Sequence, residues 1–192
     1  PALREETVRL PLNLAGADSV FESLADGLLL RHPGTSGHQP AGATTSLPAR
    51  QAFEAGTAAL NAWNLASADS ELVVATGHDP EYAQAHLWLA LVRSWTQPST
   101  PAGWRSATER AAARREALSA RDRRISDAVL ASAKGDYATA CSTWRSLAAA
   151  HEYDFVVWYG LATCLRDDHA VVPDPRSPTG WRFRSSYHEA IN

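Results

Sequence analysis

The side chains of this 192-residue chain best suited to metal binding or catalysis are its seven histidines and two cysteines. A zinc site needs such residues in a tight group, as in H-E-x-x-H, where two histidines share one face of a helix. Neither that pattern nor a close Cys/His cluster occurs in the sequence. We therefore expect no metal site and a structural or surface role for each histidine. The histidines are His32, His38, His78, His86, His151, His169 and His188.

Motifs for nucleophilic catalysis and for phosphate binding are also missing. No G-x-S-x-G nucleophile elbow occurs in the chain. Gly34 and Gly37 lack the spacing of a phosphate-binding loop, and the only lysine, Lys134, lies far from them. The sequence therefore predicts neither an enzyme activity nor a cofactor.

A run of arginines is the feature closest to a nucleic-acid-binding patch. Glu109, Glu116 and Asp122 interrupt the run, and its i, i+4 spacing is typical of a solvated helical face. The whole chain has a net charge of −3 and a pI of about 6.2, so we expect no nucleic-acid partner. The arginines of the run are Arg110, Arg114, Arg115, Arg121, Arg123 and Arg124.

The first 46 residues differ in pattern from the rest of the chain. Apolar residues alternate from Val8 to Leu14, which predicts a half-buried strand, and Asp18 is a suitable N-cap for a following amphipathic helix. We interpret residues 1–31 as a strand–helix remnant of a preceding α/β domain. Residues 32–46 are rich in Gly, Pro, Ser and Thr and predict a flexible linker. Because the chain contains no Met and opens at Pro1, we expect a fragment or a processed form of a longer protein.

From about Leu47 to Asn192 the apolar spacing indicates one helix after another, with Gly and Pro between the helices. The longest apolar runs span only a few residues, as at Leu28–Leu30, so no membrane insertion is expected within this chain. Beyond Asp168 a proline-rich loop interrupts the pattern, and residues 181–192 then predict the start of one more, truncated helix.

A 34-residue spacing relates these helices to one another. Starting positions at Ala49, Ala83, Arg121 and Phe155 place comparable residues in register, with about four additional residues in the second unit. A helical hairpin of this length, with W-x2-L-G-x2-Y followed by A-x3-F and a final Pro, is the tetratricopeptide-repeat signature. Small residues are needed where the two helices of one hairpin cross, and large residues fill the space to the next hairpin.

The segment Trp158-x2-Leu161-Ala162-x2-Leu165 follows the first half of that signature, and Ala140-x3-Trp144 follows the second half. Gly56 and Ala128 occupy the small position of their first helices. We therefore predict an all-α fold, a tetratricopeptide-type helical-hairpin solenoid (an α–α superhelix) over residues 47–192. The alternative is an ordinary helical bundle with accidental spacing, whose helices would not follow one common 34-residue spacing.

The chain resembles the tetratricopeptide-repeat tails of bacterial membrane-anchored serine/threonine kinases and of TolB-like regulators. The resemblance rests on Phe53–Trp95, on Arg121–Asp168 and on the Ser46-Leu47-Pro48-Ala49 junction. It implies a non-catalytic protein-interaction or sensing module of a larger bacterial signalling regulator, in the cytoplasm or outside it. Any kinase would lie upstream, since no kinase motif occurs here. The alternative is the repeat segment of a bacterial transcriptional regulator.

In repeats of this family the first helix of each hairpin lines a concave groove, where a protein or peptide partner binds. Leu87 and Val129 are expected to face an open groove and to tolerate a charge, whereas Leu89 and Ala128 are expected in the core. The alternative is a groove filled by the chain's own N-terminal segment or by a missing domain. The register predicts these partner-binding residues: Arg50, Phe53, Thr57, Asn61, Gln84, Leu87, Leu91, Trp95, Asp122, Ile125, Val129, Val156, Tyr159 and Thr163.

The two cysteines are predicted to lie at nearly the same height on neighbouring helices. Cys141 precedes a turn expected near Glu152–Tyr153, and Cys164 follows that turn by a similar number of residues. In an oxidising compartment the two could form a disulfide bond. We expect instead two buried free thiols, because buried cysteine is common and a bridge between helices needs special geometry.

Overall fold

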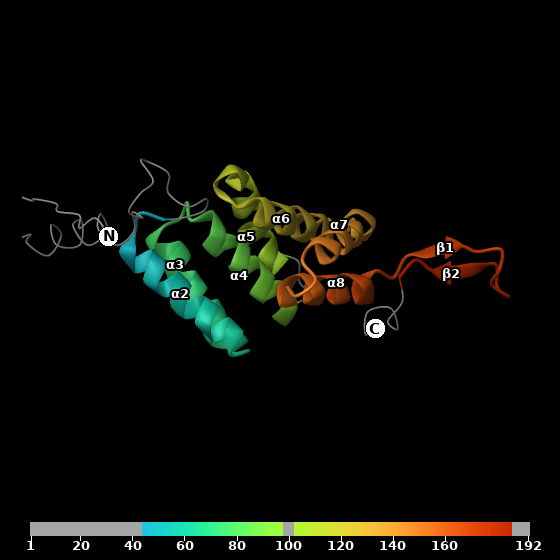
Figure 1. The fold of residues 1–192 in the computed structure, drawn as a ribbon, viewed down its shortest axis with the longest axis horizontal. Helices are drawn as coiled ribbons and strands as arrows, with labels where there is room; N and C mark the ends of the chain where they lie inside the picture. Colours follow the sequence, from blue (N-terminus) through green and yellow to red (C-terminus); the bar gives the residue numbers. More distant parts are fainter. Residues whose placement is uncertain (1–43, 98–101, 186–192) are drawn as a thin grey trace, which may run out of the picture.

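The computed structural model describes residues 44–97 and 102–185, and these form an array of antiparallel helices that ends in a small β-hairpin (Figure 1). The predicted strand–helix of residues 1–31 and most of the predicted linker lie outside the described residues. Seven α-helices occur in the described part. They are α2 (Leu47–Asn61), α3 (Leu65–His78), α4 (Ala83–Thr96), α5 (Ala102–Ala113), α6 (Ala120–Ala133), α7 (Tyr137–Ala150) and α8 (Phe155–Asp167).

Polar side chains cap the starts of α2, α3, α6, α7 and α8. Ser46 accepts a hydrogen bond from the backbone N–H of Ala49 at the start of α2, and Asp154 accepts from Val156 and Val157 at the start of α8. Such caps satisfy N–H groups that the first turn leaves without partners. Thr44, which belongs to the predicted linker, is buried and donates a hydrogen bond to the Asp79 carboxylate.

The helices pack in sequence order as helical hairpins, α2 with α3, α4 with α5 and α6 with α7, and each hairpin packs on the next. The first helices begin at residues 47, 83, 120 and 155, close to the predicted starts at 49, 83, 121 and 155. The turns predicted at Gly135–Asp136 and Glu152–Tyr153 fall between helices, as expected. The array of consecutively packed helical hairpins is therefore confirmed and is compatible with a helical repeat. The predicted loop at residues 98–101 lies outside the described residues.

Small residues permit the close crossing of α2 and α3. A Cβ added to the buried Gly56 would lie 2.9 Å from Cγ of Leu72, a distance at which the leucine would have to move. Ala128 on α6 is fully buried, as expected for the same position in the third hairpin. One apolar core then continues from Leu60 in the first hairpin to Leu165 in α8.

The segment beyond α8 differs from the prediction. Instead of starting a helix, residues 181–183 form strand β2 (Trp181–Phe183), which pairs antiparallel with β1 (Val171–Pro173). The Asp168 carboxylate receives two hydrogen bonds of 2.7 Å from the Arg184 guanidinium and one of 2.9 Å from the Ser185 hydroxyl. The prediction of a helix is therefore wrong for residues 181–185. The hydrogen bonds of Asp168 with Arg184 and Ser185, which we call the Asp168 clamp, hold this part of the chain at the end of α8. Residues 186–192 lie outside the described residues.

The expectation of free thiols is also wrong, because Cys141 and Cys164 form a disulfide bond. Their Cα atoms lie 5.5 Å apart, within the range that a disulfide requires. The equal height of the two residues on α7 and α8 follows from their distances to the turn. The lateral approach of the two helices could not be derived from that spacing.

The arginine run does not form one helical face. It extends over the end of α5, a short 3-10 helix (Arg115–Ala117) and the start of α6. Arg114 pairs with Glu81, Arg115 with Asp127 at 2.8 Å and Arg123 with Glu116 at 3.3 Å. These carboxylates neutralise much of the run, and exposed pairs of this kind contribute little to stability.

Candidate partner-binding surface

The middle of the predicted groove is filled by the protein itself. Leu87 is 0% exposed, and Leu91, Ile125 and Val129 are also buried. The expectation that Leu87 and Val129 face open solvent is therefore wrong. The first helices α4 and α6 contact each other directly, so side chains that would line a wider superhelix meet in the core.

The remaining predicted residues divide between the two ends of the array. In the first hairpin, Phe53 packs against Tyr82 with ring centroids 5.1 Å apart, and Arg50 pairs with Glu54 at 2.8 Å. Asn61 is exposed. At the other end, Trp95 on α4 and Tyr159 on α8 meet with ring centroids 5.0 Å apart. The partly exposed residues of the predicted set are Arg50, Phe53, Thr57, Gln84, Trp95, Val156, Tyr159 and Thr163.

Asp122 takes part in a hydrogen-bonded network within the fold. It is buried and accepts from Arg121 at 2.6 Å, and Arg121 also donates to Asp154 at 2.6 Å, which ties the start of α6 to the cap of α8. Burial disfavours the charged form of Asp154. The hydrogen bond and positive charge of Arg121, with the N–H groups at the start of α8, outweigh burial and lower the pKa of Asp154.

A small pocket lies where the predicted groove would run between the second, third and fourth units. Its volume of about 40 Å³ is far below the several hundred Å³ of sites for drug-sized ligands. It can receive part of one side chain. Twelve residues from five helices line it: Leu91, Ser94, Trp95, Trp104, Val129, Ser132, Tyr137, Trp144, Gly160, Thr163, Cys164 and Asp167.

Four of the twelve lining residues are aromatic, and each of the five helices contributes a polar group to the pocket. Trp104 is buried, and its indole Nε1–H has no hydrogen-bond partner among the described residues. Burial, together with the negative charges of Asp167 and Asp168, raises the pKa of the Tyr137 hydroxyl. Tyr137 therefore stays a neutral hydroxyl, able to donate, throughout the physiological range.

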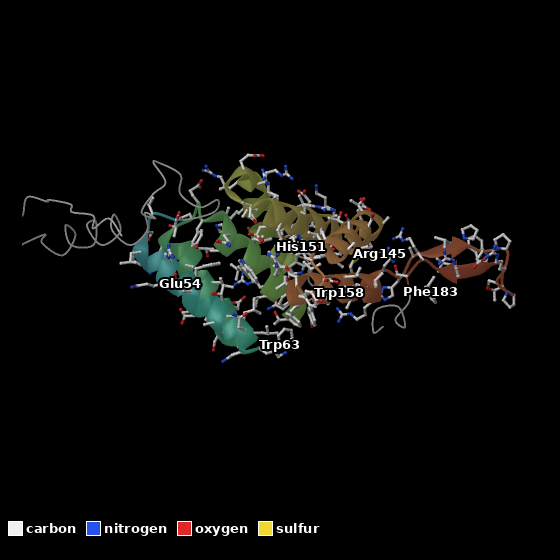
Figure 2. All side chains as sticks on the ribbon, in the orientation of Figure 1. Glu54, Trp63, Arg145, His151, Trp158 and Phe183 are labelled. Carbon is white, nitrogen blue, oxygen red and sulfur yellow. A yellow bond between two sulfur atoms is a disulfide. The ribbon has the colours of Figure 1, made fainter. Side chains whose placement is uncertain are left out.

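A cluster of four aromatic rings adjoins this pocket through Trp95, a member of both. We call Trp63, Trp95, Phe155 and Tyr159 the aromatic cluster. Trp63 lies within 6.0 Å of each of the other three ring centroids, stacked on Trp95 and edge-on to Phe155 and Tyr159. Trp63 is 46% exposed and Phe155 is 57% exposed. Figure 2 shows Trp63 at the far end of the first hairpin, on the side where α8 begins.

Sequence reasoning found Trp95 and Tyr159 in this region but missed Trp63 and Phe155 of the cluster and Trp104 and Trp144 of the pocket. Trp63 lies in a turn, outside the first-helix positions from which the groove was predicted. Trp104 and Trp144 lie on the second helices α5 and α7, which the same rule assigns to the opposite face. The available signal was the number of tryptophans, seven in 192 residues, a residue type common at binding hot spots.

The comparisons with known proteins returned nothing: no protein-family model, no curated protein and no solved structure matches the chain. The fold therefore defines the class only as an array of helical hairpins. In the parts described, residues 44–97 and 102–185, no helix has the length and apolar character needed to cross a membrane. Over the same residues, no group of three or more His, Cys, Asp or Glu side chains could hold a metal ion.

Proposed function

We propose that the chain is a non-catalytic protein-interaction module of the tetratricopeptide-repeat type, which binds a segment of a partner protein at the aromatic cluster and its neighbouring pocket. The observation that carries the proposal is the half-exposed aromatic cluster, to which the first, second and fourth helical units each contribute. Exposed tryptophan and tyrosine side chains that converge on one place are typical of binding hot spots.

The assignment to the tetratricopeptide type rests on the spacing and on the small residues. Hairpin starts recur about 36 residues apart, and Gly56 and Ala128 occupy buried crossing positions in the first and third hairpins. The Ser46-Leu47-Pro48-Ala49 junction, which caps α2, favours placement within a larger bacterial signalling regulator of the kind the sequence resembles.

A protein segment suits this surface better than a small metabolite. The pocket is too small to enclose a cofactor, and it opens beside rings that remain exposed. An extended segment could place one apolar side chain on the rings while its backbone accepts a hydrogen bond from a donor of the pocket wall such as the Tyr137 hydroxyl. Aromatic rings that line a groove are a recurring feature of peptide recognition.

The test is selection of binding peptides from a random displayed library with the full 192-residue chain, followed by affinity measurement on the selected sequences. Tyr159→Ala should weaken binding by tenfold or more, about 1.4 kcal/mol, because the variant removes a central ring from the surface that the partner contacts. Val74→Ala is the matched control, since it removes an exposed apolar side chain from α3. Equal weakening by both variants, or selected peptides indifferent to Tyr159→Ala, would exclude the aromatic cluster as the site.

A further inference from the structure

The turn that carries Trp63 has an unusual residue at its key position. Helix α2 ends in a Schellman motif, in which the Trp63 N–H donates to the Leu60 carbonyl and the Asn64 N–H donates to the Ala59 carbonyl, both at 2.8 Å. This motif needs a left-handed backbone at the residue after the C-cap, and Trp63 has φ of 58°. Glycine adopts that conformation without steric cost, whereas a bulky residue is strained in it.

The third hairpin contains the same turn with glycine at the left-handed position. Helix α6 ends with Gly135 at φ of 78°, and the N–H groups of Gly135 and Asp136 donate to the carbonyls of Ser132 and Ala131. The next residue caps the following helix in both turns, Asn64 for α3 and Asp136 for α7. The fold can therefore close this turn with glycine, and the backbone motif does not require the tryptophan at residue 63.

The contacts of Trp63 are equally unusual for a helical array. In a solenoid each unit contacts its neighbours, yet the Trp63 ring of the first hairpin contacts Phe155 and Tyr159 of the fourth unit. Its ring stacks on Trp95 at 6.0 Å with an angle of 24° between the planes. Strain at a half-exposed residue that makes long-range contacts points to a function, because packing elsewhere must hold it in place.

We infer that Trp63 is a ligand supplied by the chain itself, occupying the place on Trp95 and Tyr159 that the aromatic anchor of a partner peptide takes in the complex. This inference rests on the proposed function and adds the partner's chemistry: a segment bearing a Trp or Phe side chain. The partner's ring reproduces the contacts of Trp63 without its backbone strain. Binding moves Trp63 aside and opens the cluster next to the pocket.

Such a self-ligand lowers the apparent affinity for the partner. If the place is open only part of the time, the apparent dissociation constant rises by the reciprocal of the open fraction. Removing the Trp63 ring should then tighten binding of an aromatic peptide. If Trp63 were instead part of the surface that contacts the partner, its removal would weaken binding. The two roles predict opposite signs.

The experiment measures, by NMR titration of the full chain, the affinity for acetyl-Gly-Ser-Trp-Ser-Gly-amide and for the same peptide with Ala in place of Trp. The proteins are the wild type, Trp63→Gly and Trp63→Asn, since glycine and asparagine both tolerate the left-handed backbone of this turn. We expect both variants to bind the Trp peptide at least about threefold more tightly than the wild type. The Ala peptide should bind none of the three proteins.

Equal or weaker binding of the Trp peptide by both variants would overturn the self-ligand while leaving the proposed function intact. If none of the three proteins binds the Trp peptide, two proposals are overturned: that Trp63 is a self-ligand, and that a partner segment binds at the aromatic cluster. Unfolding of both variants would show that Trp63 serves the structure, and would also overturn the inference. A circular dichroism melt of each variant gives that last result directly.

Discussion

The indole ring of Trp144 on α7 lies directly against the backbone of Gly160 on α8. A Cβ placed on Gly160 would lie 2.6–2.7 Å from three carbon atoms of the ring, a separation that real side chains do not adopt. The absence of a side chain at residue 160 therefore sets how closely the last helix approaches the third hairpin. The disulfide bond Cys141–Cys164 joins the same two helices.

Gly160→Ala should destabilise the protein by about 1–3 kcal/mol, because the buried Trp144 ring or the helix backbone would have to shift from its packed position to admit the methyl group. Chemical denaturation monitored by circular dichroism measures the loss. Gly77→Ala is the matched control, since Gly77 lies on α3 and a Cβ there would meet nothing within 4 Å. The control should be neutral or slightly stabilising, because alanine favours a helix over glycine. A stable Gly160→Ala protein would contradict the close approach.

The disulfide bond should stabilise the fold by about 3 kcal/mol, the value expected for closing a loop of this length in the unfolded chain. The two cysteines are 23 residues apart in the sequence. A thiol count on protein denatured without reductant should find no free thiol, and reduction or Cys141→Ala/Cys164→Ala should lower the denaturation midpoint. Two free thiols in oxidised protein would show that the bond does not form.

Leu87→Glu should unfold the protein as severely as Leu89→Glu, because both leucines are buried and either change places an unpaired carboxylate in the core. We expect losses of several kcal/mol in each case. Asn61→Glu, in the same predicted groove but exposed, is the control and should melt close to the wild type. A folded Leu87→Glu protein would restore the open concave face that the sequence predicted.

We expect His86 to reduce the stability of the protein at pH values below about 6.5, which is the pKa of histidine in an unfolded chain. Its Nε2–H donates to the Pro80 carbonyl at 2.9 Å, and its Nδ1 has no partner among the described residues. Burial, and to a lesser degree the charge of Arg110, lower the pKa of His86 against the opposing effects of Pro80 and Asp79.

The sign of the effect follows from that lowered pKa. The unfolded chain binds a proton at His86 more readily than the folded protein, so stability is full above pH 6.5 and declines as the pH falls toward the folded pKa. Thermal melts between pH 7.5 and 5 measure the slope. His86→Gln retains a donor for Pro80 without titrating, and it should flatten the slope. An unchanged slope in this variant would assign the effect to other groups.

Helix positions could be predicted from the sequence because they depend on local patterns. Pro80 and Gly135 marked helix ends, and apolar periodicity marked the helices between them. The β-hairpin could not be predicted, since its strands are three residues long and its base depends on the pairing of Asp168 with Arg184 across 16 residues. Hydrogen bonds between distant residues leave no periodic signal in the sequence.

The candidate surface was predicted only in part, for a related reason. The repeat register identified Trp95 and Tyr159, whose place depends on the face of their own helix. It placed Leu87 and Val129 on the open face, although the distance between α4 and α6 buries them. Trp63 depends on a turn conformation that usually selects glycine, so its sequence position gave no reason to expect it there.

The hydrogen bonds of Asp168 with Arg184 and Ser185 at the base of the β-hairpin would allow the hairpin to change in length. Asp168 and Ser185 are joined by a hydrogen bond of 2.9 Å, so the hairpin leaves the end of α8 and returns to it at nearly the same point. Residues 169–184 therefore form an excursion whose two ends already meet. A segment inserted or shortened there would leave the spacing of the helices unchanged, as is typical of sites that accept grafted loops. Residues 175–179 form the tip of the hairpin, beyond the hydrogen bond from the Asp174 N–H to the Gly180 carbonyl, and a label or an additional peptide attached there should not disturb the helices.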